Sequence, residues 1–213
     1  MAGETLSEQI YKELYRDITH QSLKCGEKLT LKMLKERFDV SHTPIREALM
    51  RLSECGLVTY YSNCGVSVID FTQEDITELY RFASELDSMA IRFCGDIYNP
   101  MPLYEDLGEI VDNGTACLNA GDLEGWKEYS EKFHSIFYVH AHNSYLDEAY
   151  ARIRAKMEVL SCMYYNEKSI PEINAEHVNI CARVKEGRFE EAATLMREHL
   201  KYGMTCALKA YKK

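Results

Sequence analysis

The segment spanning residues 40–52, VSHTPIREALMRL, constrains the fold of this chain more than any other stretch. Thr43-Pro44 is typical of a helix start. Four apolar residues then recur at the i, i+3, i+4, i+7 spacing of one helix face, namely Ile45, Ala48, Leu49 and Leu52. Arg46 falls on the opposite face, so it can contact another molecule. This pattern predicts a short amphipathic helix with a polar outer side.

A second amphipathic segment lies just upstream, and its apolar side is formed by Leu31, Leu34 and Phe38. The small turn Asp39-Val40-Ser41 separates it from the helix above. Two short helices joined in this way predict a helix-turn-helix. Binding to double-stranded DNA is therefore the first hypothesis.

The flanking residues complete a recognisable small domain. Residues 7–22 predict a preceding helix with an apolar stripe, and residues 25–28 predict a turn. Two β-rich segments follow, at 57–60 and 66–69, with a tight connection over 61–65. Three helices followed by a β-hairpin predict a winged helix-turn-helix over residues 1–70.

Net charge and cysteine usage narrow the class of protein. The net charge of −9 argues mildly against DNA binding, but the excess of acidic residues lies in residues 71–213 and the first 70 are nearly neutral. Such a domain can bind DNA through a clustered basic face, tightly only as a dimer and with marked salt dependence.

The 8 cysteines form no CxxC pair, which argues against a zinc ribbon and favours reduced thiols. With no membrane-length apolar run and no visible secretory signal, a cytoplasmic protein is expected.

Residues 71–213 predict helices almost throughout. Breaks are expected at 95–102, 121–122, 143–144, 170–171 and 187–188, and no convincing strand pattern interrupts them. The result is about six helices in an all-α bundle. The predicted fold is therefore mainly α, with a winged helix-turn-helix at 1–70 and a helical effector-binding and dimerisation domain at 71–213.

Three histidines of the second domain are expected to face inward from three different helices. His134, His177 and His199 each share an apolar stripe with neighbours three or four residues away. A single inward histidine is usually a core residue with a polar partner. Three in one small bundle could instead share a divalent metal ion, zinc or nickel being expected. His140 and His142 are expected at the surface or in a loop.

The first domain resembles the N-terminal domain of GntR-type bacterial transcription regulators over about forty residues, from LTLKMLKERFDVSHTPIREALMRLSECGLV to the glycine-bearing NCGVSV. The resemblance places the hydroxyls of Ser41 and Thr43 at the start of the recognition helix, where they meet phosphate. It places Arg46 where the family's arginine reaches a guanine edge or the backbone. An ion pair of Arg46 with Glu47 or Glu54 is the alternative.

The same resemblance assigns three further DNA-binding positions. Lys32 begins the second helix, where a basic residue meets phosphate, and Gly65 lies at the tip of the wing. His42 occupies the position of an arginine in the family, so base preference there is expected to differ. Arg51 remains open between a DNA contact and an ordinary surface arginine.

The second domain resembles the FCD effector domain of the FadR subfamily. The matching motifs are KFH, AHNSYL and EHVNICARVKEGRFEEAATLMREHL. In the metal-binding branch, three histidines and an aspartate four residues before the first of them hold the ion. His134, His177 and His199 match, but Ser130 stands at the aspartate position. The site could bind metal with water or effector in the vacated position, bind it weakly, or have lost it.

Other positions bear on the effector. Ser130 and Asn143 are expected to contact it, although Asn143 could equally cap a helix. Ala83 stands where the family often has an arginine facing the ligand, and Asp87 stands at its glutamate. The absence of that arginine weakens the expectation of a simple carboxylate effector.

The resemblance implies a regulator rather than an enzyme. We expect a homodimer on a palindromic operator, controlled by a small metabolite that a metal ion could help to bind. One alternative is a DNA-binding dimer whose helical domain has lost effector and metal binding. Another is a metal-dependent hydrolase, which is disfavoured because the sequence has no HExxH motif or other positioned general base.

Overall fold

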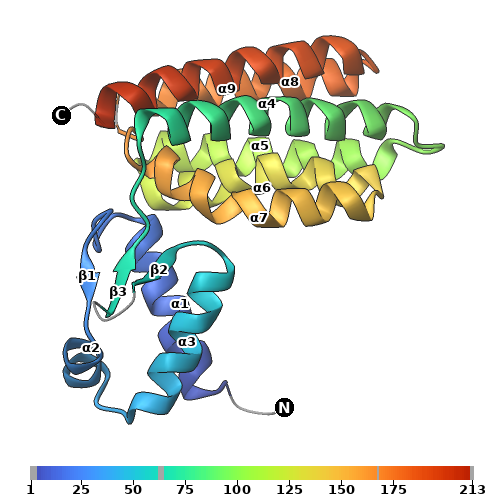
Figure 1. Cartoon of the computed structure of the whole chain (residues 1–213). Helices are drawn as coiled ribbons and strands as arrows, with labels where there is room; N and C mark the ends of the chain where they lie inside the picture. The colour runs from blue at the N-terminus through green and yellow to red at the C-terminus, as the bar shows by residue number, and fades with distance from the viewer. Residues whose placement is uncertain (1–3, 62–64, 167, 212–213) are drawn as a thin grey trace. The chain divides into compact units, whose positions relative to one another are not determined.

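The computed structural model describes residues 4–61, 65–166 and 168–211, and its helices and strands are labelled in Figure 1. The chain forms two compact units. The first consists of Met1–Asp75 with Ala151–Met163, and the second of Ile76–Tyr150 with Tyr164–Lys213. Each unit is described separately below.

Three helices begin the first unit, and they are α1 (Leu6–Thr19), α2 (Leu31–Phe38) and α3 (His42–Glu54). The Thr5 side chain accepts a hydrogen bond from the backbone N–H of Glu8 and so caps α1. Thr30 caps α2 in the same way. Asp39 then ends α2 with a left-handed backbone (φ 51°), a conformation that a short polar side chain tolerates. These local signals produce the predicted helix-turn-helix.

The apolar face of each helix forms the core of this unit. Its members are at most 3% exposed and include Ile10, Leu14, Ile18, Leu34, Ile45, Leu49 and Leu52. Burial of these apolar side chains is the main contribution to the stability of the unit, at roughly 25 cal/mol per Å² of apolar surface removed from water. The opposite face of α3 is left to solvent.

A small antiparallel sheet completes the first unit. Its strands are β1 (Lys28–Leu29), β2 (Val58–Tyr61) and β3 (Gly65–Val68), in the order β1-β3-β2. The hairpin matches the predicted strands closely, whereas its turn at 62–64 lies outside the described residues. The predicted turn at 25–28 is partly wrong, because Lys28 already pairs with Ser67 in β1. A strand of two residues is too short to show an alternating pattern.

Six helices are described beyond residue 71: α4 (Gln73–Gly95), α5 (Met101–Ala120), α6 (Leu123–Ala141), α7 (Ser144–Cys162), α8 (Ile170–Lys185) and α9 (Phe189–Tyr211). Four of the predicted breaks separate helices as expected, but the break predicted at 170–171 is wrong: α7 ends at Cys162, and Ile170 and Pro171 form the first turn of α8, where proline is tolerated. Thr72 and Asp75 cap the start of α4 reciprocally, each side chain accepting from the other's backbone N–H. Gly121 ends α5 with φ 73°, and Asp122 then caps α6 through the N–H of Gly125.

Large aromatic side chains fill the interior of the helical unit, including Tyr80, Trp126, Phe133 and Phe137. The hydroxyl of Ser88 in α4 donates to the carbonyl of Ala193 in α9 (3.0 Å), which ties two distant helices together. Figure 1 shows α8 and α9 running alongside each other. Among the described helices, none has both the length and the apolar character needed to cross a bilayer.

Candidate functional site

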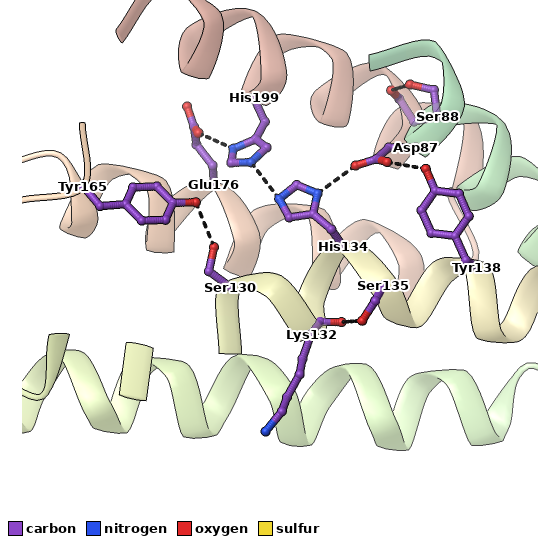
Figure 2. Close-up of polar contacts among 11 residues, drawn as sticks. Asp87, Ser88, Ser130, Lys132, His134, Ser135, Tyr138, Tyr165, Glu176 and His199 are labelled. Atoms are coloured by element: carbon purple, nitrogen blue, oxygen red, sulfur yellow. Dashed lines mark hydrogen bonds and ion pairs between the residues drawn. The ribbon is translucent and has the colours of Figure 1, made fainter. Parts of the chain in front are cut away.

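The three predicted histidines converge inside the helical unit. His134 comes from α6, His177 from α8 and His199 from α9, and their ligand nitrogens all lie within 4.8 Å of one another. The Nε2 atoms of His134 and His199 are 3.3 Å apart. Figure 2 shows these two rings facing each other, although their helices, α6 and α9, are far apart in the sequence.

Two carboxylates hold the outer nitrogens of this cluster. The Nδ1 atom of His134 lies 2.7 Å from Asp87 Oδ2, and the Nδ1 atom of His199 lies 2.7 Å from Glu176 Oε2. The hydroxyl of Tyr138 donates to the other oxygen of Asp87 (Figure 2). Because an ionised carboxylate only accepts hydrogen bonds, a proton on each Nδ1 satisfies both pairs, and this tautomer leaves on each Nε2 the lone pair that metal binding requires. The pairs therefore orient both Nε2 atoms as acceptors or metal ligands.

His177 lacks such a partner among the described residues. Its Nε2 atom is buried and makes no hydrogen bond there, while its ring stacks on Phe133 with centroids 3.9 Å apart. Burial, and then the neighbouring His199 and His134, lower its pKa well below the ordinary value of 6.5. An unsatisfied buried nitrogen costs about 1–3 kcal/mol. A bound cation would supply the missing partner.

His199 is also held in the neutral form. Burial lowers its pKa below the ordinary value, and the hydrogen bond to Glu176 opposes part of that effect. A metal ion binds neutral imidazole, so the buried cluster favours the protonation state that coordination requires.

The donor set fits a divalent transition-metal ion. Imidazole nitrogens suit zinc and nickel, and zinc–nitrogen bonds of about 2.0–2.1 Å in a tetrahedral site put two ligands about 3.3 Å apart. The separation of 3.3 Å between the Nε2 atoms of His134 and His199 equals that spacing. Three protein ligands leave at least one coordination position for another molecule.

Ser130 lies beside the cluster, one helical turn before His134. Its hydroxyl is 3.2 Å from the hydroxyl of Tyr165, as Figure 2 shows. Ser130 and His177 both line a small cavity of about 10 Å³, close to the room that one water molecule needs. A neutral serine in this position provides no anionic ligand, so the predicted departure from the metal-binding pattern persists in three dimensions.

The other residues expected near the effector have different surroundings. Asn143 accepts hydrogen bonds from the backbone N–H groups of Tyr145 (3.1 Å) and Leu146 (3.2 Å), so it caps α7. Ala83 is buried in α4 and 2% exposed. The expectation that His140 lies at the surface is wrong. It is buried in α6 and bonds to an aspartate on α5.

The start of α3 presents an exposed polar edge. Ser41, His42, Thr43 and Arg46 are all exposed. Ser41 is the N-cap residue, yet its hydroxyl makes no capping hydrogen bond, and no acidic residue lies in the first turn. The first backbone N–H groups of a helix favour anions, so this edge is suited to phosphate. Within the described part of the chain, Arg46 forms no ion pair with Glu47 or Glu54.

Other basic residues of the first unit separate into available and engaged groups. Lys32 is highly exposed and only 4.0 Å from Glu36, a weak surface pair. Arg51 pairs with Glu8 and lies over the ring of Tyr11, 4.0 Å from its centroid, so it is engaged within the first unit. Gly65, at the start of β3, has φ 89°, a conformation that favours glycine.

Sequence reasoning gave no role to the two carboxylates that hold the histidines. One signal was present for Asp87, because it interrupts the buried stripe of α4 formed by Ala83, Ala90 and Cys94. A charged residue on an inward face needs a partner, so it marks a buried polar contact. Glu176 gave a weaker signal, since its side chain is 36% exposed and resembles a surface residue.

Comparison with known protein families gives two matches. A model described as "FCD domain" matches residues 78–202, and one described as "Bacterial regulatory proteins, gntR family" matches residues 6–68. Together they cover most of the chain; residues 151–163, which group with the first compact unit, lie within the FCD match. The first match alone extends over more than half of the chain.

Individual proteins match over most of the chain. The chain is 24% identical over 208 residues to the HTH-type transcriptional regulator McbR of Escherichia coli (strain K12), covering 94% of this chain and 93% of that protein. It is 22% identical over 198 residues to the HTH-type transcriptional repressor RspR of the same organism, covering 92% and 86%.

Solved structures show the same fold. The structure of E. coli McbR/YncC aligns with a TM-score of 0.81 at 21% identity, covering 99% of this chain and 100% of that chain. A GntR regulator from Rhodococcus sp. RHA1 aligns with a TM-score of 0.80 at 22% identity, covering 96% and 98%. At these identities the likeness concerns the fold alone.

Proposed function

The chain belongs to the GntR family of bacterial regulatory proteins and has an FCD domain, and we propose how this DNA-binding transcription regulator is controlled. A small molecule binds the helical domain beside a metal ion held by three histidines, and its binding changes the affinity for an operator. The observation that carries this proposal is the buried, unsatisfied Nε2 of His177 in a cluster of three histidines whose ligand nitrogens all lie within 4.8 Å of one another. Such an arrangement is incomplete without a cation.

For DNA reading, we assign the contacts to residues 1–70. Ser41, Thr43 and the first N–H groups of α3 hold a phosphate, and Arg46 reaches a base edge or the backbone. Lys32 adds a phosphate contact. The wing contributes through Gly65, and His42 modifies base preference at the position where the family has arginine. A homodimer formed through residues 71–213 places two such domains on a palindromic operator.

For effector binding, His134, His177 and His199 hold a divalent ion, zinc or nickel, which acts as a Lewis acid toward a ligand atom. Ser130 leaves the position beside His134 open for water or effector, and its hydroxyl can hydrogen-bond what occupies it. Asn143 is assigned to the rim of the site in addition to its capping contacts. Effector binding and operator binding are then coupled reciprocally through the dimer.

The metal assignment is tested by elemental measurement of the purified full chain before and after chelator treatment. We expect about one zinc or nickel per chain, and a loss of more than about 100-fold in affinity for His177→Ala, since even indirect contacts cost 10–100-fold. His140→Ala removes another buried histidine and is the matched control. Equal metal content in both variants would reject the three-histidine site.

The operator is found by selecting duplexes from a random library with the full chain. A palindrome with half-sites about one helical turn apart supports the dimer, because paired domains read equivalent half-sites. Zinc and chelator are then compared in anisotropy titrations with the selected duplex. The second candidate is a DNA-binding dimer without an effector site, and Ser130 and Ala83 support it. An affinity for the duplex that does not depend on metal, in a protein that contains none, would favour this candidate.

An enzymatic role is not proposed. Among the described residues, Asp87 and Glu176 are the carboxylates that contact the cluster, and both already bind imidazole nitrogens. Neither is placed to activate a water molecule as a general base. The relatives are transcription regulators, which agrees with this assignment.

A further inference from the structure

We propose that Asp87 and Glu176 are positioning residues of the metal centre, and that they supply its negative charge, because Ser130 leaves the direct ligand set neutral. They hold the outer nitrogens of two histidines and provide negative charge on the far side of each imidazole ring, through a hydrogen bond. This inference rests on the proposed metal binding. It assigns to this chain's own residues the charge that a direct aspartate ligand would otherwise contribute.

Asp87 is the more deeply placed of the two. It is 3% exposed, and both its oxygens are used, one by His134 Nδ1 and the other by the hydroxyl of Tyr138. The ring of Tyr138 is itself fixed by stacking on Tyr150, with centroids 4.0 Å apart. The carboxylate therefore has a defined orientation, and it defines the orientation of the imidazole in turn.

Glu176 performs the same task from the other side of the cluster. It precedes His177 in α8, so one helix provides both a ligand and the residue that orients another ligand. Its Oε2 atom lies 2.7 Å from His199 Nδ1, but its side chain is 36% exposed, against 4% for that of Asp87. Water can replace part of its effect, so Glu176 is expected to contribute less than Asp87.

The charges of the site support this division of roles. Three neutral imidazoles leave the two positive charges of a divalent ion uncompensated within its coordination sphere. The carboxylates of Asp87 and Glu176 balance those charges through the imidazole rings and make the ligand nitrogens more basic. The hydroxyl of Ser130 adds no charge and is not a proposed ligand. The coordination position next to it is therefore left to a molecule other than the protein. The arrangement would hold the ion beside a cavity of about 10 Å³, which has room for an exchangeable ligand of the size of one water molecule.

A second carboxylate–histidine pair in the same domain provides a built-in control. Asp106 lies 2.8 Å from His140 Nε2, and neither residue belongs to the cluster. Glu172 is a matched control for Glu176, because it lies one turn earlier in α8 and bonds to Tyr202 instead. Loss of either control carboxylate breaks a comparable hydrogen bond without touching a proposed ligand.

The test measures zinc affinity of the full chain by competition with a chromogenic chelator, and cobalt absorption spectra as a second readout. We expect Asp87→Asn to weaken zinc binding by about 10–100-fold and Glu176→Gln by less. Asp87→Glu keeps the charge and should recover much of the affinity. Asp106→Asn and Glu172→Gln should remain within about two-fold of the wild type, since neither contacts a ligand.

The outcomes separate this inference from the proposed function. If the wild type binds no zinc, both the metal proposal and this inference fail. If the wild type binds zinc and both Asp87→Asn and Glu176→Gln bind it equally well, only the positioning role is overturned. Should Asp87→Asn fail to fold, Glu176→Gln decides the question, because its partly exposed side chain makes that substitution easier to tolerate. An unchanged cobalt spectrum and zinc affinity in that variant would then overturn the proposal.

Discussion

The start of α3 and the histidine cluster present their polar groups in opposite ways. At α3, Ser41 and Arg46 are exposed, and within the described residues they lack the hydrogen bonds or ion pairs that would occupy them. In the cluster, His134 and His199 are engaged by carboxylates, and a single buried nitrogen of His177 is left over. In the proposed DNA contact, the first site gains nearly all of its interactions from a partner. The second site is organised in advance, and the proposed metal ion is small enough to complete it.

This difference predicts different sensitivities to substitution. A residue of the α3 edge can be removed with little cost to folding, because solvent already surrounds it. A residue of the cluster supports both ligand binding and packing. Variants at the two sites should therefore separate operator affinity from stability.

The largest effect is expected for Arg46→Ala in operator binding. Loss of an arginine that contacts a base edge costs about 1–3 kcal/mol, equivalent to about 5–150-fold in affinity. Fluorescence anisotropy with the selected duplex, at fixed salt, measures the change. Arg51→Ala is the control, because Arg51 is engaged by Glu8. Similar losses in both variants would contradict the distinction between the available and the engaged arginine.

A comparable effect, in stability rather than in DNA affinity, is expected on metal removal. Zinc at about 100 times its dissociation constant should stabilise the fold by about 2.7 kcal/mol. For a domain of this size that corresponds to roughly 5–10 °C in Tm. Thermal unfolding with zinc and with chelator measures the shift. His177→Ala should abolish the zinc-dependent shift in Tm, and His140→Ala should preserve it. A wild type whose Tm does not change with zinc would argue against a pre-organised site.

A pH effect is expected in the metal-free protein. Burial lowers the pKa of His177 and His199 below 6.5, so the unfolded chain binds more protons than the folded chain as the pH falls below that value. Their stabilising contribution is present above pH 6.5 and is lost at lower pH. Each proton bound only by the unfolded state changes stability by at most about 1.4 kcal/mol per pH unit.

Urea unfolding between pH 7.5 and 5.5 measures that slope. His177→Phe keeps an aromatic ring against Phe133 and should flatten the dependence, whereas His42→Gln, at an exposed position, should leave it nearly unchanged. Identical slopes in all three proteins would show that the buried histidines do not contribute. The pH dependence of the free energy of unfolding therefore distinguishes the buried histidines from the exposed histidine at the start of α3.

How far the sequence predicts this molecule depends on whether the signal is local. The helices of both units follow from apolar periodicity and caps that lie within a few residues of each other, such as Thr72 and Asp75. Inward-facing histidines follow from the same periodicity. The contact of Asp87 with His134 joins residues 47 positions apart, and no local pattern encodes it. Strand β1 was missed for a related reason, because its two residues are defined only by their pairing with β3.

The smallest effect is expected for Asn143→Ala, which separates a capping residue from a binding residue. Loss of an N-cap side chain costs about 1 kcal/mol, or about 2–4 °C in Tm for a domain of this size. Asn143→Asp retains an acceptor for the N–H groups of Tyr145 and Leu146 but removes the amide donor. If Asn143 acts only as a cap, Asn143→Asp should match the wild type in Tm and in zinc-dependent operator affinity. If the amide also contacts a ligand, the aspartate variant should keep its stability and lose part of that regulation, which would place Asn143 with the pre-organised site rather than with the surface.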